Sequence, residues 1–201
     1  TLDHTGYFEA DELRRKIESR GLSVSSLCPE NVVYPWQYAA RKPLHAQRSL
    51  AYFKHGIELA EVLGAPYMSI NSLCMESLRP EESNLVVTLA DARRMLDQVA
   101  SPHLTPMVDT TAMGVAGESL EEWFAEFGDG AIRNMRFIDG DPYGHLVWGD
   151  GKHSMDDFVR VLNAHGFEGY LGQEITDGRY FDDPAAADRH NMDAFERYFV
   201  D

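Results

Sequence analysis

Residues 132–139 read Ile-Arg-Asn-Met-Arg-Phe-Ile-Asp, a run typical of a short β-strand that ends on an acidic residue. Two further runs, at residues 105–109 and 170–175, have the same apolar character and also carry an acid at or near their end. Between these runs, Ser119 and Ser154 open segments with helical spacing of apolar residues. Short strands that alternate with helices in this way predict βα units and a parallel sheet.

The chain outside this stretch continues the same alternation. Segments with the spacing and end signals of helices are predicted at residues 11–20, 46–63, 88–99, 119–127, 154–166 and 185–199. Strands are predicted at residues 22–27, 66–70, 105–109, 132–138 and 170–175. A parallel sheet built from such units is either doubly wound or a closed barrel. Because no glycine-rich phosphate loop follows any strand, the doubly wound nucleotide-binding fold is disfavoured.

Acidic residues stand at the carboxyl ends of successive predicted strands: Glu76, Asp109, Asp139 with Asp141, and Glu174. A single acid at such a place is most simply a helix cap or a solvated loop residue. Acids at four successive strand ends favour instead the rim of a (β/α)8 TIM barrel, where active sites form. The sequence therefore predicts an α/β TIM barrel with an acidic site at that rim.

The charge balance limits the class of partner. Lys plus Arg number 18 and Asp plus Glu number 33, which gives a formal net charge of −15. Such an excess of carboxylates repels phosphate backbones, so neither DNA nor RNA is expected as a partner. No apolar run approaches about 18 residues and no signal-peptide pattern opens the chain, so we expect a cytoplasmic protein with no membrane partner. Cys28 and Cys74 each lie in an apolar strand-like run and are expected to be buried, reduced thiols.

Residues 70–76 break the βα pattern. Their sequence, Ile-Asn-Ser-Leu-Cys-Met-Glu, joins the end of one predicted strand directly to another. Parallel neighbours need a crossover of a dozen or more residues, so this stretch is either one long strand or lacks a helix-containing piece. We expect a single barrel domain over residues 1–201, with a segment missing between Ser72 and Leu73.

Six stretches carry a resemblance to a known family: residues 28–36, 75–84, 107–110, 132–139, 149–151 and 169–174. In this order they resemble the sugar phosphate isomerase/epimerase superfamily of xylose-isomerase-like barrels, and within it the fructoselysine 3-epimerase-type proteins. The resemblance extends over nearly the whole chain. It implies an incomplete barrel, in which the chain supplies strands three to eight of the family's eight and lacks the first strands and one internal crossover helix.

The resemblance also implies a divalent metal site. Family members hold the metal with Glu, Asp, His and Glu, and three of these positions match Glu76, Asp109 and Glu174. The remaining position carries Arg136, whose guanidinium is permanently protonated and cannot donate a lone pair to a metal.

Other side chains are candidates to complete this ligand set, namely His145, Asp139 or Asp141. Oxygen-rich ligation suits Mn²⁺ or Mg²⁺, and one added imidazole favours Mn²⁺, Co²⁺ or Zn²⁺. Of these metals, Mn²⁺ is the one we expect.

The activity that the resemblance implies is that of an isomerase or epimerase acting on a sugar or on a sugar conjugate such as a ketoamine. Such an enzyme removes a proton from the carbon beside a carbonyl, forms an enediolate and returns a proton, and Glu76 and Glu174 are expected to be the acid/base pair. The residues expected to contact the substrate are Arg136, His145, Tyr34 and Trp36. A homo-oligomer is expected.

Two other functions stay open. A lyase of the same fold, such as a sugar-derivative dehydratase or a C-glycoside-cleaving subunit, would use a histidine such as His145 as a base beside the metal. A barrel that has lost its metal would act as a binding or partner subunit. The metal content of the protein separates the last function from the other two.

Overall fold

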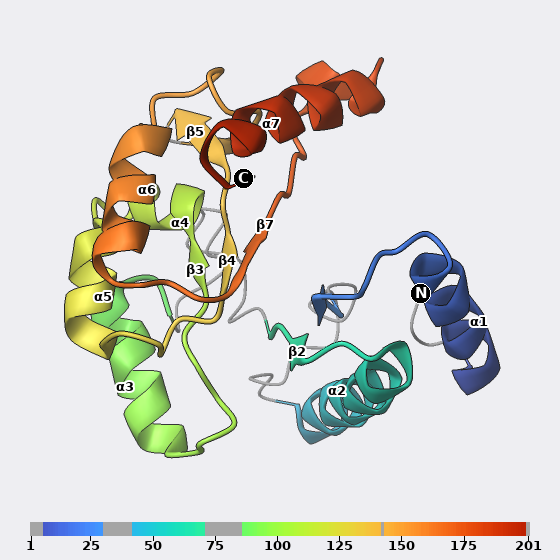
Figure 1. The fold of residues 1–201 in the computed structure, drawn as a ribbon. Coiled ribbons are helices and arrows are strands. Elements are labelled where there is room, and N and C mark those ends of the chain that lie inside the picture. The colour runs from blue at the N-terminus through green and yellow to red at the C-terminus, as the bar shows by residue number, and fades with distance from the viewer. Residues whose placement is uncertain (1–5, 30–41, 71–85, 142, 200–201) are drawn as a thin grey trace. The chain divides into compact units, whose positions relative to one another are not determined.

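A computed structural model describes residues 6–29, 42–70, 86–141 and 143–199 of the chain (Figure 1). The chain divides into two compact units, residues 1–71 and 72–201, and each is described by itself. Within the described ranges, no helix is long and apolar enough to cross a membrane. Ser72 and Leu73, between which a missing segment is predicted, lie outside the described residues, so that prediction stays open.

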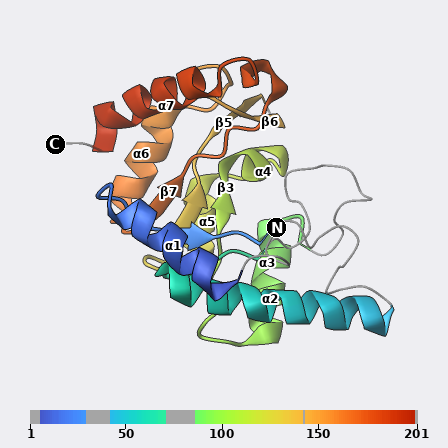
Figure 2. The ribbon, with the colours of Figure 1, turned by 90° about the vertical axis from the view of Figure 1, so that its right-hand side faces the viewer.

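The first unit combines two helices with two short parallel strands. In chain order these are α1 (Tyr7–Glu18), β1 (Ser26–Leu27), α2 (Pro43–Leu63) and β2 (Tyr67–Met68). β1 pairs with β2 in parallel, and α1 packs against α2, which Figure 2 shows from a second direction. Ala10, Leu59 and Leu63 form the small apolar core of this unit. Helix α2 ends where the sequence predicts, because Gly64 takes a left-handed conformation with φ of 72°.

Cys28 departs from its predicted environment. The prediction of a buried thiol is wrong for this residue, whose side chain is exposed. Strand β1 ends at Leu27, so Cys28 follows the strand and does not lie within an apolar layer. Cys74 lies outside the described residues.

The second unit contains a parallel sheet, an antiparallel hairpin and the helices around them. Its helices are α3 (Leu89–Val99), α4 (Thr110–Val115), α5 (Leu120–Phe127), α6 (Met155–Ala164) and α7 (Pro184–Phe199), with a 3₁₀ turn η3 (Gly178–Tyr180). Its strands are β3 (Val108–Asp109), β4 (Asn134–Arg136), β5 (Asp139–Asp141), β6 (Tyr143–Leu146) and β7 (Tyr170–Gly172). β3, β4 and β7 pair in parallel in that order, while β5 and β6 form the hairpin. This alternation is the predicted βα pattern of a partial α/β barrel.

The apolar core of the second unit lies between the sheet and the helices beside it, among them α5 and α6 (Figure 1). Phe137, just after β4, is fully buried. Its ring centroid lies 4.8 Å from that of Trp148 and 5.7 Å from that of Phe195 on α7. Aromatic side chains bury more apolar area than any others, so these contacts anchor α7 to the end of β4.

The β5–β6 hairpin is a feature that the sequence pattern does not predict. The loop after it is organised by Asp139, which is fully buried. Asp139 Oδ1 accepts hydrogen bonds from the N–H groups of Gly140 and His153, and Oδ2 accepts those of Gly149 and Gly151. A Cβ at residue 151 would lie 2.2 Å from Asp139 Oδ1, so only glycine lets the loop approach this carboxylate. Asp139 is therefore a structural centre of this segment.

Asp139→Asn should lower the free energy of unfolding by about 2–4 kcal/mol. Hydrogen bonds to a charged acceptor contribute about 1.5–3 kcal/mol each, and Asn replaces one acceptor oxygen with an NH₂ group that faces backbone donors. Urea unfolding followed by circular dichroism measures the loss. Asp141→Asn, which removes an exposed carboxylate paired with Lys152, is the control and should change stability by less than about 0.5 kcal/mol. Equal losses in the two variants would contradict the structural role of Asp139.

His165 follows α6 and connects it to α5. Its ring stacks on Phe124 with 4.6 Å between the centroids. His165 Nδ1 lies 2.7 Å from Asp129 Oδ1, and Nε2 lies 3.2 Å from Glu121 Oε1. Hydrogen bonds to Asp129 and then to Glu121 favour the imidazolium and raise the pKa of His165 above its usual value.

The stability that His165 contributes should therefore depend on pH. Because its pKa is higher in the folded than in the unfolded chain, the contribution is fully present below about pH 6.5 and is lost as the pH rises through the folded pKa. His165→Gln should reduce the stability difference between about pH 5.5 and pH 8.5 in urea unfolding. His190→Gln, which removes an exposed histidine of α7, is the control for loss of a histidine. If His165→Gln keeps the full stability difference between the two pH values, the ion pairs of His165 with Asp129 and Glu121 do not stabilise the fold.

Candidate metal centre

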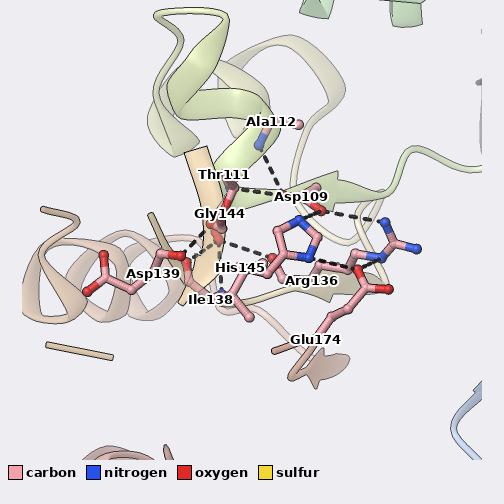
Figure 3. Close-up of polar contacts among 10 residues, drawn as sticks. Asp109, Thr111, Ala112, Arg136, Ile138, Asp139, Gly144, His145 and Glu174 are labelled. Atoms are coloured by element: carbon pink, nitrogen blue, oxygen red, sulfur yellow. Dashed lines mark hydrogen bonds and ion pairs between the residues drawn. The ribbon is translucent and has the colours of Figure 1, made fainter. Parts of the chain in front are cut away.

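Three side chains meet at the carboxyl ends of the parallel strands (Figure 3). Asp109 ends β3, and Arg136 ends β4 directly opposite it in the register. Gly172 ends β7 opposite Arg136, and Glu174 follows two residues later. Positions two residues apart along an extended chain point to the same face. The register therefore brings Asp109, Arg136 and Glu174 to one face of the sheet at this end.

A fourth side chain enters from the hairpin. His145, which lies outside every helix and strand that the sequence predicts, is on β6 and is only 4% exposed. Its Nδ1 lies 3.2 Å from Glu174 Oε2, and its Nε2 lies 3.6 Å from Asp109 Oδ2. The Thr111 hydroxyl, at the start of α4, donates to the carbonyl of Gly144 at 3.3 Å. This bond ties the hairpin to α4, so that the imidazole stands between the two carboxylates.

Asp109 is 5% exposed, and its two oxygens have different partners. Oδ1 accepts hydrogen bonds from the N–H groups of Thr111 and Ala112 at 2.9 and 3.0 Å, which caps the short helix α4. Oδ2 faces Arg136 and His145 instead. Burial raises the pKa of Asp109, although the charge of His145 favours its ionised form. A nearby cation is therefore important for keeping this carboxylate charged.

Arg136 connects the two carboxylates. Its Nε lies 2.8 Å from Glu174 Oε2, and its Nη1 lies 3.6 Å from Asp109 Oδ2. The side chain of Arg136 is 11% exposed and that of Glu174 is 25% exposed. Burial alone would raise the pKa of Glu174, but the contact with His145 and the charges of Arg136 and His145 together hold it below its usual value. Glu174 is therefore ionised at neutral pH.

Asp109, His145 and Glu174 form a group that fits a divalent cation. One potential ligand atom from each lies within 4.8 Å of the others. Within the described part of the chain, four buried atoms of this group make no hydrogen bond of regular geometry: Asp109 Oδ2, His145 Nδ1 and Nε2, and Glu174 Oε2. Buried polar atoms normally have a hydrogen-bond partner, and among the described residues these four have only ion pairs with Arg136 or with one another, which leaves them able to accept a ligand. Carboxylate oxygens and an imidazole nitrogen are ligands that Mn²⁺, Co²⁺ and Zn²⁺ accept.

The structure brings together part of the predicted site. The predicted residues that lie in one cluster are Asp109, Arg136, His145 and Glu174. The predicted residues that lie outside the described part of the chain are Glu76, Tyr34 and Trp36. Their roles stay predictions.

Two acids that the sequence offers as further ligands do not join the cluster. Asp139 uses both carboxylate oxygens on backbone N–H groups, and Asp141 pairs with Lys152 at 2.6 Å on the surface. Sequence reasoning also misses Thr110, whose hydroxyl donates to the Ile138 carbonyl at 2.6 Å and accepts from the Ile138 N–H at 3.0 Å. These bonds hold the start of α4 against the end of β4. The hydroxyl pair directly after a strand-end acid is the signal that could have revealed this role.

Comparisons with known proteins identify the family and the fold. A family model described as xylose isomerase-like TIM barrel matches residues 70–198. The fructoselysine 3-epimerase of Escherichia coli O157:H7 is 32% identical over 125 residues, which cover 61% of this chain and 45% of that protein. The chain thus spans less than half the length of this curated relative.

Solved structures with the same fold are more distant in sequence. The apo form of the 3-keto-D-glucoside 4-epimerase YcjR from E. coli has a TM-score of 0.76 and 16% identity, covering 95% of this chain and 85% of that chain. The IolI protein with a bound zinc atom has a TM-score of 0.67 and 16% identity, covering 100% of this chain and 85% of that chain. Likeness at these identities shows the fold alone. The family model matches more than half of the residues of this chain, so the chain belongs to the xylose isomerase-like TIM barrel family.

Proposed function

We propose that this chain is part of a divalent-metal-dependent sugar epimerase or isomerase, which moves a proton at the carbon beside a carbonyl through an enediolate. The observation that carries the proposal is the cluster of Asp109, His145 and Glu174, with ligand atoms within 4.8 Å of one another and without regular hydrogen bonds. Membership of the family and 32% identity to a fructoselysine 3-epimerase support the same class of reaction. The proposed substrate is a sugar or a sugar conjugate such as a ketoamine.

Asp109, His145 and Glu174 would hold the metal, with Glu76 as the proposed fourth ligand. A divalent cation supplies the positive charge that stabilises the oxygens of an enediolate. Carboxylates combined with an imidazole favour Mn²⁺ over Mg²⁺, and they also accept Co²⁺ or Zn²⁺. The zinc atom bound to IolI, a protein with the same fold, supports a divalent metal without specifying which one.

Glu174 is the residue proposed to remove the proton. Its contacts with His145 and Arg136 hold its pKa low, so its carboxylate is ionised and can accept a proton. Oε2 faces His145 and Arg136, and Figure 3 draws both contacts at this one carboxylate oxygen of Glu174. Epimerisation returns a proton from the opposite face, which requires a second acid/base group. Glu76 is the proposed second group.

The remaining predicted features belong to the same proposal. Arg136 and His145, together with Tyr34 and Trp36, are the proposed substrate contacts. Planar guanidinium groups and aromatic rings suit the oxygens and apolar faces of a sugar. A cytoplasmic location and a homo-oligomer, without nucleic acid or membrane partners, also stay predictions.

Glu174→Gln should suppress exchange of solvent deuterium into the substrate. With Mn²⁺ and a ketoamine such as fructoselysine in deuterated water, the wild-type protein should place deuterium at C3 and form the epimer. Loss of the base should lower this exchange at least about 100-fold, because general acid–base catalysis contributes about 10²–10⁴-fold. Proton NMR measures the exchange. Glu168→Gln, an exposed position just before β7, should retain wild-type exchange.

The product identifies the reaction class in the same experiment. An unsaturated or cleaved product would show that the reaction is that of a lyase and would contradict the proposed epimerisation. A metal-loaded protein that shows neither exchange nor product with ketoses and ketoamines would contradict a catalytic role.

Asp109→Asn should weaken Mn²⁺ binding at least about tenfold, because it removes one of the anionic ligands. The fold should persist, since an Asn side-chain oxygen can accept the same capping hydrogen bonds at the start of α4. Titration calorimetry on metal-free protein gives the affinity. Asp141→Asn is the matched control and should bind Mn²⁺ as the wild type does, because its carboxylate lies on the surface. Unchanged affinity in Asp109→Asn would exclude this residue as a ligand.

A further inference from the structure

Arg136 lies within the candidate metal group, although its guanidinium cannot ligate a metal. Its Nε is 2.8 Å from Glu174 Oε2, and its Nη1 is 3.6 Å from Asp109 Oδ2. These are the same two oxygens that face the imidazole of His145. The guanidinium and any cation bound by this group therefore share their acceptor oxygens.

The charges make these two cations competitors. With both carboxylates ionised and the imidazole neutral, as metal ligation requires, Asp109 and Glu174 carry two negative charges, and Arg136 carries one positive charge that it cannot lose. Adding a divalent cation would set three positive charges against the two negative charges of these described residues. Arg136 is 11% exposed and Asp109 is buried, so water screens this repulsion much less than it would at the surface.

We propose that Arg136 is a built-in counter-ion that competes with the divalent metal for Asp109 and Glu174. Without metal, the guanidinium holds the two carboxylates together and offsets their mutual repulsion. When metal binds, the guanidinium gives up part of these contacts, so the site binds its metal more weakly than the same ligands would without the arginine. Arg136 is thus a positioning residue that sets metal affinity. The inference rests on the proposed metal role of the cluster.

A purely structural role for Arg136 predicts the opposite result. If the arginine only kept the carboxylates in place, its removal would loosen the ligands and weaken metal binding. If it competes with the metal, removal of its charge tightens metal binding even though the metal-free protein becomes less stable. The sign of the change in metal affinity therefore separates the two roles.

Titration calorimetry of metal-free protein with Mn²⁺, and separately with Zn²⁺, measures this sign. Arg136→Met and Arg136→Gln both remove the charge, and the polar Gln provides a second variant if Met impairs folding. Both should bind metal at least about tenfold more tightly than the wild type, because a repelling charge is gone. Arg136→Lys retains a cationic side chain and should bind metal less tightly than the two neutral variants.

Arg93→Met is the matched control for loss of an arginine. Arg93 pairs with Asp97 at 2.6 Å on the exposed surface of α3. The variant therefore changes the net charge by the same amount as Arg136→Met, but at a position where solvent screens the charge far more strongly. It should bind metal as the wild type does. A rise in affinity equal to that of Arg136→Met would assign the effect to net charge and overturn the local competition.

Thermal unfolding gives a second readout on the same proteins. In EDTA, the two neutral variants should melt at a lower temperature than the wild type, because two carboxylates have lost their counter-ion. With saturating Mn²⁺, their melting temperature should rise by more than that of the wild type, since tighter binding stabilises the folded state further. An equal rise in all proteins would contradict the competition.

The outcomes also distinguish this inference from the proposed function. Neutral variants that bind no more tightly than a metal-binding wild type would overturn the competition and leave the metal centre intact. Absence of metal binding in the wild type and in every variant would overturn both the competition and the proposed metal-dependent function. Binding that is seen only in the neutral variants would support the competition and show that the arginine suppresses metal uptake.

Discussion

The register of β3, β4 and β7 is the constraint on which the rest of the site depends. Val108 and Met135 lie opposite each other and are fully buried in the apolar core, so the residues that follow them turn to the other face of the sheet. Those residues are Asp109 and Arg136. A shift of one residue would exchange the two layers and bury the charges among the apolar side chains. The free energy gained by burying the apolar layer thus also fixes where the charged layer stands.

Hydrogen bonding separates the structural carboxylates of this unit from the candidate functional ones. Asp139 is fully buried and has both oxygens occupied by backbone N–H groups, so it has no acceptor left for a ligand. Asp109 is almost as buried, yet only Oδ1 is occupied, by the amides at the start of α4. Its Oδ2 and Glu174 Oε2 make no regular hydrogen bond among the described residues. Burial alone would not have distinguished these acids.

Local patterns account for what the sequence could predict, and long-range hydrogen bonds account for what it could not. Strands near residues 132–138 and 170–175 and the acids at their ends follow from alternation and from the order of the βα units, and the structure contains them. The β5–β6 hairpin depends instead on bonds from Asp139 to residues 149–153 and from Thr111 to the hairpin, which no local pattern encodes. His145 therefore lies outside every predicted helix and strand and becomes a buried part of the site only in the fold.

Arg136 shows that the fold determines the place of a site residue without determining its chemistry. The register puts this position beside Asp109 whatever side chain it carries. The resemblance to the family implies an imidazole there, and a guanidinium in its place contributes charge but no lone pair. One imidazole nevertheless reaches the same two carboxylate oxygens, because the hairpin brings in His145. The cluster therefore keeps a nitrogen donor while it gains a fixed positive charge, and under the proposed function that charge competes with the cation for the same two oxygens.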